Sequence, residues 1–404
     1  KTMGMNAFII EGTRSPIGSF GGVLRDVRTD DLGAHSLSSL ISKFKNLDLE
    51  QIEDIYLGCA NQAGEDNRNV ARMASLLAGI PASVPAETIN RLCASGLSSV
   101  LHAQRAINSG AGDFFIAGGV ENMTRGPYIV SKSSKAFGTD SKMYDSSFGW
   151  RFVNSRMKST YGAEAMGETA ENLVEQYSIS REDQDKFAFW SQEKTQRAKT
   201  SGIFSQEISS LSIPQRKSED IIVSEDEFPK PNTTIEGLSK LRPAFRSPGT
   251  VTAGNSSGLN DGSCALLIAS EAGVKTINAN PLARVVCGTS VGVEPRTMGI
   301  GPVLASKKAL KMAGLTMDQM DLIEINEAFS AQVLSCTREL GLEDTDPRIN
   351  PNGGAISLGH PLGMTGARLA LTAAKELNRS GGRYALVTMC IGVGQGFAVI
   401  LERQ

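Results

Sequence analysis

Short apolar runs alternate with amphipathic segments along most of the 404-residue chain. This pattern predicts buried strands that alternate with covering helices, which is typical of an α/β protein. We expect strands over residues 7–11, 113–119 and 384–389, and a helical turn leading into a strand over residues 46–59. Helices are expected over residues 32–43 and 93–108 and again after Pro361.

The pattern changes between residues 123 and 250. Residues 131–150 are polar and aromatic with little periodicity, and residues 205–238 are rich in prolines, acids and threonines. Between them, residues 164–201 have a strongly helical pattern. We interpret 123–250 as an inserted loop domain. The remaining chain then divides into a first half, 1–122 with 251–282, and a second half, 283–404.

The second half repeats the first. Residues 48–58 align with residues 316–326 at an offset of 268, and residues 106–117 align with residues 376–387 at an offset of 270. Two segments with the same order of strands and helices predict one fold used twice. In this register the helix that begins near Cys93 corresponds to the helix that begins near His360.

Composition narrows the class of protein. Hydrophobic residues make up 40% of the chain and charged residues 21%, as in soluble globular proteins. With 41 basic and 43 acidic residues the net charge is -2, so no basic excess indicates nucleic acid as a partner. No apolar run approaches the ~18 residues of a membrane span, and the N-terminus lacks the apolar region of a signal peptide.

The six cysteines are far apart and never form a Cys-x-x-Cys pair. We therefore expect neither a disulfide framework nor a metal site. A reducing compartment, the cytoplasm, fits this cysteine usage best.

Cys93 is the first candidate for chemistry, because it is predicted at the beginning of a helix. Free N–H groups and the positive end of the helix dipole both lower a cysteine pKa at that place. The alternative is a small buried hydrophobic residue. His360, in a glycine-rich stretch at the equivalent place of the repeat, is the candidate base that activates the thiol. Its alternative role is to satisfy backbone carbonyls in a tight turn, which suits His35 and His102 better.

Two further residues follow predicted strands. Cys390 opens Cys-Ile-Gly-Val-Gly-Gln-Gly, where a thiol beside a glycine turn can exchange a proton next to an oxyanion hole. The glycine spacing alone is weak evidence for a dinucleotide site, because no following helix and acidic residue accompany it. Asn326 opens Asn-Glu-Ala-Phe, and its amide either holds an oxyanion or a water or caps a helix.

Six motifs along the chain resemble those of the thiolase family, in the family's order and over essentially the whole length. They are Arg-Ser-Pro-Ile-Gly-Ser-Phe-Gly-Gly (14–22), Asn-Arg-Leu-Cys-Ala-Ser-Gly (90–96), Val-Thr-Ala-Gly-Asn-Ser-Ser-Gly (251–258), Asn-Glu-Ala-Phe (326–329), Gly-Gly-Ala-Ile-Ser-Leu-Gly-His-Pro (353–361) and Cys-Ile-Gly-Val-Gly-Gln-Gly (390–396). The resemblance implies an α/β thiolase fold, a five-layered αβαβα body of two similar halves with an inserted loop domain. It also implies a homo-oligomer, either a dimer or a tetramer.

The resemblance also implies a role for each catalytic candidate. Cys93 is expected to be the acylated nucleophile, His360 its activating base, and Cys390 the acid and base that moves the substrate proton. Asn326 with His360 and a water is expected to form one oxyanion hole. The backbone N–H groups of Cys93 and Gly392 are expected to form the other.

Coenzyme A is implied as a co-substrate rather than a permanently bound cofactor, with an acyl-CoA as the second substrate. The implied contacts are Ser257, Phe245 and Phe329 around the pantetheine, Met157 and Met166 along the tunnel, and Lys230 at the nucleotide end. Lys230 stands where the resemblance leads us to expect arginine, and a lysine supplies charge without a bidentate fork.

The substrate class is expected from two stretches. Residues 58–73 and Phe148-Gly-Trp-Arg-Phe-Val-Asn154 look more like thiolases that cleave 3-oxoadipyl-CoA than like acetoacetyl-CoA thiolases. Ala165 also stands before Met166, where the acetoacetyl type usually carries histidine. The alternatives are an acetoacetyl-CoA thiolase, a broad 3-ketoacyl-CoA thiolase, or a thiolase-like protein that binds acyl-CoA or lipid without catalysis.

A dicarboxylate substrate has a terminal carboxylate that a cation can bind. Arg151, Arg156 and Lys158 are candidates by charge alone, and each taken singly fits a solvated loop charge better.

Overall fold

The computed structural model describes residues 5–404. The first half contributes the strands β1 (Ala7–Arg14), β2 (Gly18–Ser19), β3 (Ile52–Gly58), β4 (Ala86–Ile89), β5 (Phe114–Asn122) and β10 (Asn260–Ser270). The second half contributes the strands β11 (Ala283–Gly292), β12 (Leu322–Ile325), β13 (Tyr384–Ile391) and β14 (Gln395–Arg403).

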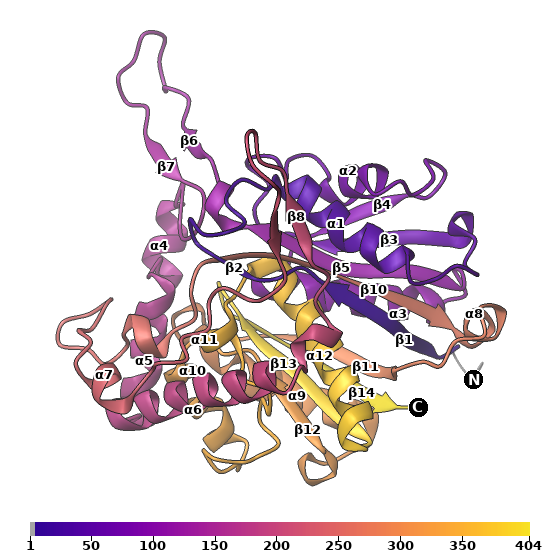
Figure 1. The fold of residues 1–404 in the computed structure, drawn as a ribbon. Helices are drawn as coiled ribbons and strands as arrows, with labels where there is room; N and C mark the ends of the chain where they lie inside the picture. The colour runs from indigo at the N-terminus through magenta and orange to yellow at the C-terminus, as the bar shows by residue number, and fades with distance from the viewer. Residues whose placement is uncertain (1–4) are drawn as a thin grey trace.

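These strands form one ten-stranded sheet in which the two halves have the same internal order (Figure 1). The halves meet where β1 pairs antiparallel with β11. Outward from this junction the order is β1, β10, β5, β3, β4 on one side and β11, β14, β13, β12 on the other. The pair β3 and β5 is parallel, and so is the equivalent pair β12 and β13. The repeated order agrees with the internal repeat of the sequence.

Helices cover both faces of the sheet halves. The first half has α1 (Thr29–Ile41), α2 (Val70–Leu77), α3 (Ser95–Asn108) and α8 (Glu271–Thr276). The second half has α9 (Gly301–Ala313), α10 (Ser330–Glu339), α11 (Ala355–Leu358) and α12 (Leu362–Ser380). None of the helices in residues 5–404 combines the length and apolar character needed to cross a membrane.

The hydrophobic clusters define five layers. Phe115 of β5 belongs to the central cluster around α3 and α12, whereas the next residue, Ile116, belongs to a cluster with α1 and α2. In the second half Val387 of β13 is in the central cluster, and Leu386 packs with α9 and α10. Because successive strand residues point to opposite faces, each sheet half lies between two helix layers. The predicted αβαβα order is therefore confirmed.

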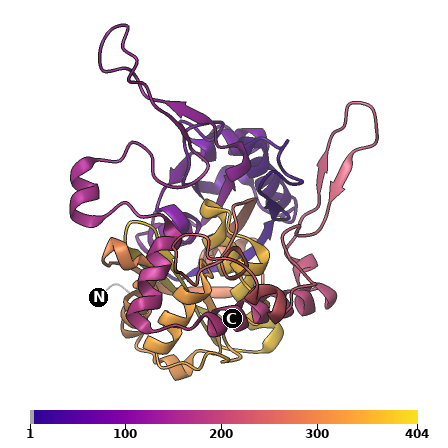
Figure 2. The ribbon, with the colours of Figure 1, turned by 90° about the vertical axis from the view of Figure 1, so that its left-hand side faces the viewer.

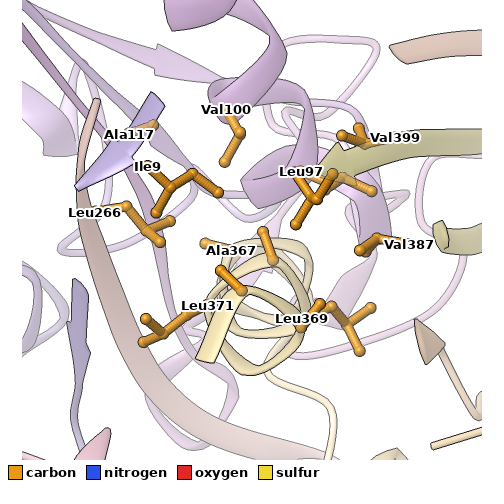
Figure 3. Packing of buried hydrophobic residues seen from close by; sticks show 14 of the residues in the cluster. Ile9, Leu97, Val100, Ala117, Leu266, Ala367, Leu369, Leu371, Val387 and Val399 are labelled. Atoms are coloured by element: carbon orange, nitrogen blue, oxygen red, sulfur yellow. The ribbon is translucent and has the colours of Figure 1, made fainter. Parts of the chain in front are cut away.

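The central layer is built around α12, as Figure 3 shows. Leu97 of α3 lies beside Ala367 of α12, with Leu266 on one side of the helix pair and Val387 on the other. All four side chains are fully or almost fully buried. The two central helices therefore hold the halves together through one shared core.

The two central helices approach each other at glycines near their first turns. A Cβ atom built on Gly96 would lie 2.6 Å from the carbonyl oxygen of Gly363, and one built on Gly366 would lie 2.3 Å from the backbone nitrogen of Leu97. Such distances exclude any side chain, so the helices contact each other backbone to backbone. This contact brings the start of α3, which follows Cys93, next to the start of α12, which follows His360.

The segment between β5 and β10 carries two hairpins that project from the body (Figure 2). Its elements are β6 (Tyr128–Val130), β7 (Met143–Asp145), α4 (Ser155–Tyr161), α5 (Met166–Tyr177), α6 (Arg181–Thr200), β8 (Leu211–Ile213), β9 (Ile221–Val223) and α7 (Ile235–Ser239). The helical pattern over 164–201 is broken at Ser178, which adopts a left-handed conformation with φ of 53°. Phe187 of α6 packs in the cluster of the second half, so this segment is tied to the body. The four-part division of the chain stays a prediction.

Candidate active site

Cys93 lies in a 3₁₀ turn, Leu92–Ala94, directly before α3. Leu92 has a φ of 45°, and its backbone N–H donates to Asn90 Oδ1 at 2.9 Å. The hydroxyl of Ser95 donates to the carbonyl oxygen of Leu92 at 2.7 Å. These hydrogen bonds fix the turn, while Cys93 itself stays partly exposed. Cys93 is therefore rigidly placed, and its burial is incomplete for the residue as a whole.

His360 lies in the turn before α12 and is 5% exposed. Its backbone N–H donates to Asn260 Oδ1 at 2.9 Å, and its Nδ1 lies 2.6 Å from Thr365 Oγ1. The hydroxyl of Thr365 donates its own hydrogen to the carbonyl oxygen of Pro361 at 3.0 Å. Since that hydrogen is used, Thr365 accepts from Nδ1–H, and the tautomer inferred for His360 has its lone pair on Nε2. The imidazole is therefore set up as a base at Nε2.

Asn326 faces this free nitrogen. Its Nδ2 lies 3.5 Å from His360 Nε2, and its Oδ1 is buried without a hydrogen-bond partner among the described residues. The neighbouring Glu327 accepts hydrogen bonds from Ser191 Oγ at 2.7 Å and from Asn350 Nδ2 at 2.9 Å, which fixes the start of the segment. The long contact leaves the amide and the imidazole free to hold one oxygen atom together.

Cys390 and Gly392 lie where β13 turns back into β14. The turn contains Val393 and Gly394, with φ of 66° and 90°. The backbone N–H of Gly392 is close enough to the thiol of Cys93 to act towards lowering its pKa. Cys390 is 1% exposed, and burial together with the nearby Cys93 raises the pKa of its thiol well above the usual value. The structure thus brings Cys93, Cys390 and Gly392 into one place.

The pKa values describe a neutral resting pair. Burial raises the pKa of the Cys93 thiol to about 11, and the N–H groups of Gly392 and of Cys93 itself offset only part of this rise. The expectation of a thiol pKa lowered by the helix start is therefore wrong, because desolvation of the thiolate outweighs the favourable dipoles. Burial, together with the charge of Arg368, lowers the pKa of His360 to about 3. At neutral pH the site holds a thiol and a neutral imidazole.

Most of the expected coenzyme A contacts gather beside this pair. The rings of Phe245 and Phe329 meet edge to face with centroids 6.2 Å apart. Phe329 shares a small hydrophobic cluster with Cys390, against which Met166 packs. The backbone N–H of Ser257 donates at 2.9 Å to the carbonyl of the residue before Phe329. Phe245, Phe329 and Met166 thus form an apolar surface beside Cys93 and Cys390, and Ser257 adds one hydroxyl group next to it.

The two other expected contacts lie further out. The ammonium of Lys230 lies 3.7 Å from the centre of the Phe228 ring, and this ring packs on Gly258. Burial lowers the pKa of Lys230. Met157 lies on α4 and is partly exposed. Contacts of these two side chains with coenzyme A stay predictions.

Three residues of the site were not predicted from the sequence. Thr365 sets the tautomer of His360, and Asn260 holds its backbone. Glu121, at the end of β5, accepts from the backbone N–H groups of Ala60, Asn61 and Gly363 at 2.9, 3.0 and 2.8 Å. A usable signal existed only for Thr365, a hydroxyl residue four positions after Pro361, which is the spacing of a bond back to a helix carbonyl.

Glu121 also lies in a buried group with Cys59 and Asp66, whose ligand atoms are within 4.8 Å of one another. The carboxylate of Glu121 already receives three backbone hydrogen bonds, and the thiol of Cys59 donates to the carbonyl oxygen of Asn61 at 3.0 Å. Burial raises the pKa of Glu121 to about 7. The group is therefore better described as a hydrogen-bonded support for the start of α12 than as a metal centre.

A duplicated α/β body with a cysteine and a histidine at facing helix starts defines the class as a cysteine-dependent acyltransferase. The chain belongs to the thiolase family: residues 7–272 match the model described as thiolase, N-terminal domain, and residues 279–403 match thiolase, C-terminal domain.

The similar proteins cover the whole chain. The chain is 53% identical to the beta-ketoadipyl-CoA thiolase of Acinetobacter baylyi, over 98% of this chain and 99% of that protein. It is 55% identical to the 3-oxoadipyl-CoA/3-oxo-5,6-dehydrosuberyl-CoA thiolase of Escherichia coli, with the same coverage. The crystal structure of human mitochondrial 3-ketoacyl-CoA thiolase superposes with a TM-score of 0.92 at 39% identity, covering 99% of both chains. The predicted family, fold and enzyme class are confirmed.

Proposed function

We propose that this thiolase cleaves 3-oxoadipyl-CoA with coenzyme A to give succinyl-CoA and acetyl-CoA. The observation that carries this proposal is the 53–55% identity, over 98% of the chain, to thiolases named for this substrate, also called beta-ketoadipyl-CoA. The structural neighbour named for general 3-ketoacyl-CoA substrates is only 39% identical.

In the first half-reaction the Cys93 sulfur attacks C3 of the substrate, and His360 Nε2 takes the thiol proton. The C2–C3 bond then breaks, which leaves a succinyl group on Cys93 and the enolate of acetyl-CoA. The enolate oxygen accepts hydrogen bonds from the new Nε2–H of His360 and from a water held by Asn326, and Cys390 protonates C2. A neutral resting pair suits this sequence, because the proton moves to the imidazole only when the thiol attacks.

In the second half-reaction Cys390, now a thiolate, takes the proton of the coenzyme A thiol. The resulting sulfur attacks the carbonyl carbon of the succinyl-Cys93 thioester. The negative charge that develops on the carbonyl oxygen is stabilised by the backbone N–H groups of Cys93 and Gly392. Collapse releases succinyl-CoA, and the Cys93 thiolate recovers its proton from His360. Removing one such oxyanion donor typically costs ~2.7 to 4 kcal/mol of barrier.

The test has two parts. Values of kcat/KM for 3-oxoadipyl-CoA and acetoacetyl-CoA decide the substrate, and a preference for acetoacetyl-CoA refutes our assignment. Mass spectrometry after incubation with acetyl-CoA decides the nucleophile. We expect an acetyl group on Cys93 and none in Cys93→Ser. An adduct on Cys390 in the wild type would overturn the assigned roles, and bound coenzyme A without any turnover would favour a non-catalytic binding protein.

We also propose that the protein is a homo-oligomer located in the cytoplasm. Support for an oligomer comes from the projecting hairpin of β6 and β7, where Tyr128, Phe137 and Met143 expose 71%, 104% and 68% of their surface (Figure 2). Exposed apolar side chains on a protruding element favour contact with a second copy. The double substitution Phe137→Ser and Met143→Ser should lower the mass measured by light scattering. Support for a reducing compartment comes from the six free cysteines.

A further inference from the structure

We propose that Arg151 binds the terminal carboxylate of the acyl group and so makes the enzyme selective for a dicarboxylate substrate. The inference rests on the proposed function, because the 3-oxoadipyl group carries the carboxylate in question. The sequence alone gave three candidates for binding this carboxylate, namely Arg151, Arg156 and Lys158. The structure separates them, since Arg156 and Lys158 are exposed on α4 and Arg151 is partly buried.

Two hydrogen bonds connect the Trp150–Arg151 segment to two other segments, which each adjoin the Cys93 turn through further contacts. On one side, Trp150 Nε1 donates at 3.1 Å to the carbonyl oxygen of Glu164, two residues before Met166. The sulfur of Met166 packs against Gly392, where Leu92 also lies close. Trp150 is therefore bonded to the segment whose Met166 packs against Gly392.

On the other side, Arg151 reaches the loop that follows β3. Its Nη2 lies 3.5 Å from Asn61 Oδ1. Ala60, the residue before Asn61, accepts a hydrogen bond through its carbonyl oxygen from Asn90 Nδ2 at 3.2 Å. Asn90 in turn accepts from the backbone N–H of Leu92 at 2.9 Å, directly before Cys93. The loop that Arg151 contacts is thus joined through Ala60 and Asn90 to the turn that carries the nucleophile.

Within residues 5–404 the guanidinium of Arg151 makes no ion pair, in contrast to those of Arg125 and Arg296, although Asp66 is close enough to interact with its charge. Arg125 pairs with Glu65, and Arg296 pairs with Glu164 at 2.6 Å. The two hydrogen bonds of Arg151 among the described residues, to Asn61 Oδ1 and to the carbonyl oxygen of Gly149, are both 3.5 Å long. Because these contacts are long and go to neutral oxygens, the five N–H donors of the planar Arg151 guanidinium remain available to bind a carboxylate.

The succinyl group has the chemistry that such a fork recognises. It holds its carboxylate carbon at most roughly 5 Å from the Cys93 sulfur, by ordinary bond lengths. A carboxylate and a guanidinium make two parallel charge-assisted hydrogen bonds, and the partly buried setting strengthens them relative to water. A substrate that ends in a methyl group makes no such bonds and leaves Arg151 as it is in the free enzyme.

The test compares 3-oxoadipyl-CoA with 3-oxohexanoyl-CoA, which has the same chain length and a methyl group in place of the carboxylate. In Arg151→Met, kcat/KM for 3-oxoadipyl-CoA should fall roughly 10- to 100-fold, the range for a lost hydrogen bond to a charged group. The value for 3-oxohexanoyl-CoA should stay within about threefold, which also shows that the variant is folded. Arg151→Lys should be intermediate, because it keeps charge and loses the fork.

Arg156→Met and Lys158→Met are matched controls that remove the exposed cations of α4, and both should keep the wild-type ratio. Equal losses on both substrates in Arg151→Met, or an unchanged ratio, would overturn the role of Arg151. So would a loss of selectivity in either control. A wild-type enzyme without preference for 3-oxoadipyl-CoA over 3-oxohexanoyl-CoA would instead refute the proposed function itself.

Discussion

Replacing Thr365 with valine removes the acceptor that fixes the tautomer of His360. The two side chains are nearly isosteric, so the change deletes the 2.6 Å contact with Nδ1 and leaves the volume almost unchanged. In the resting enzyme the buried Nδ1–H loses its partner, which costs about 1–3 kcal/mol. During attack by Cys93 the imidazole becomes positively charged, and a hydrogen bond to a charged group contributes about 1.5–3 kcal/mol. Because the resting enzyme also loses a neutral hydrogen bond, which contributes about 0.5–1.5 kcal/mol, only the difference of about 1–1.5 kcal/mol raises the barrier. Since 1.36 kcal/mol is tenfold in rate, we expect acylation to slow roughly 5- to 15-fold.

The assay is the single-turnover rate of acetylation of Cys93 by acetyl-CoA, followed by mass spectrometry, together with the free energy of unfolding in urea. Thr365→Ser keeps the oxygen and should acylate at nearly the wild-type rate. Thr365→Val should be slow in acylation with little change in KM, because the hydrogen bond to Nδ1 is present in the resting enzyme and strengthens only when the imidazole becomes charged. A valine variant that is less stable yet acylates at the wild-type rate would show that Thr365 supports only the fold, and the tautomer argument would fail.

Three further predictions follow from the pKa values and the helix crossing. The wild type minus Cys93→Ala difference in absorbance at 240 nm should show no thiolate between pH 5 and 9, because the thiol pKa is about 11; a midpoint below pH 8 would contradict the neutral pair. The pKa of His360 in the folded protein, about 3, lies below the value of about 6.5 for an unfolded chain. As the pH drops from about 6.5 towards 3, the unfolded state therefore binds the proton first. The free energy of unfolding falls over this range by up to about 1.36 kcal/mol per pH unit. His360→Asn should flatten that slope in urea titrations, and an unchanged slope would assign the loss to other groups. Gly96→Ala places a Cβ atom 2.6 Å from the oxygen of Gly363 and should lower the unfolding free energy by at least about 1–3 kcal/mol, whereas Gly292→Ala, with no atom within 4 Å, should be nearly neutral.

The internal repeat predicted that the turn of Cys93 and the turn of His360 are equivalent, and the structure places these turns at the neighbouring starts of α3 and α12. The order of strands around β1 and β11 follows from that repeat as well. The burial of the site residues, which decides their pKa values, could not be predicted from the sequence. A helix start argued for a low thiol pKa at Cys93, yet desolvation reverses the direction, and only the packed structure shows how far the thiol is removed from water.

Side-chain partners from distant segments were equally inaccessible. The motif around His360 marks the residue, but the carboxamide of Asn260 that holds its backbone comes from 100 positions earlier in the chain. Glu121 reaches Gly363 across 242 positions, and no spacing rule connects them. Likewise, charge alone did not separate Arg151 from the cations of α4. Arg151 is distinguished from those cations by its contact with Asn61, and this contact depends on the relative positions of two loops in the folded protein.

The duplicated fold explains why a cysteine and a histidine so far apart in sequence lie at neighbouring helix starts. Two copies of the same unit, joined through β1 and β11, place their central helices side by side, so equivalent positions in the two halves become neighbours. Gly96 and Gly363 keep those helix starts in backbone contact, and the turn before each start is free to carry a different functional group. Symmetry of the backbone thus supplies proximity, and divergence of the two turns supplies two different functional groups, a thiol from one half and an imidazole from the other.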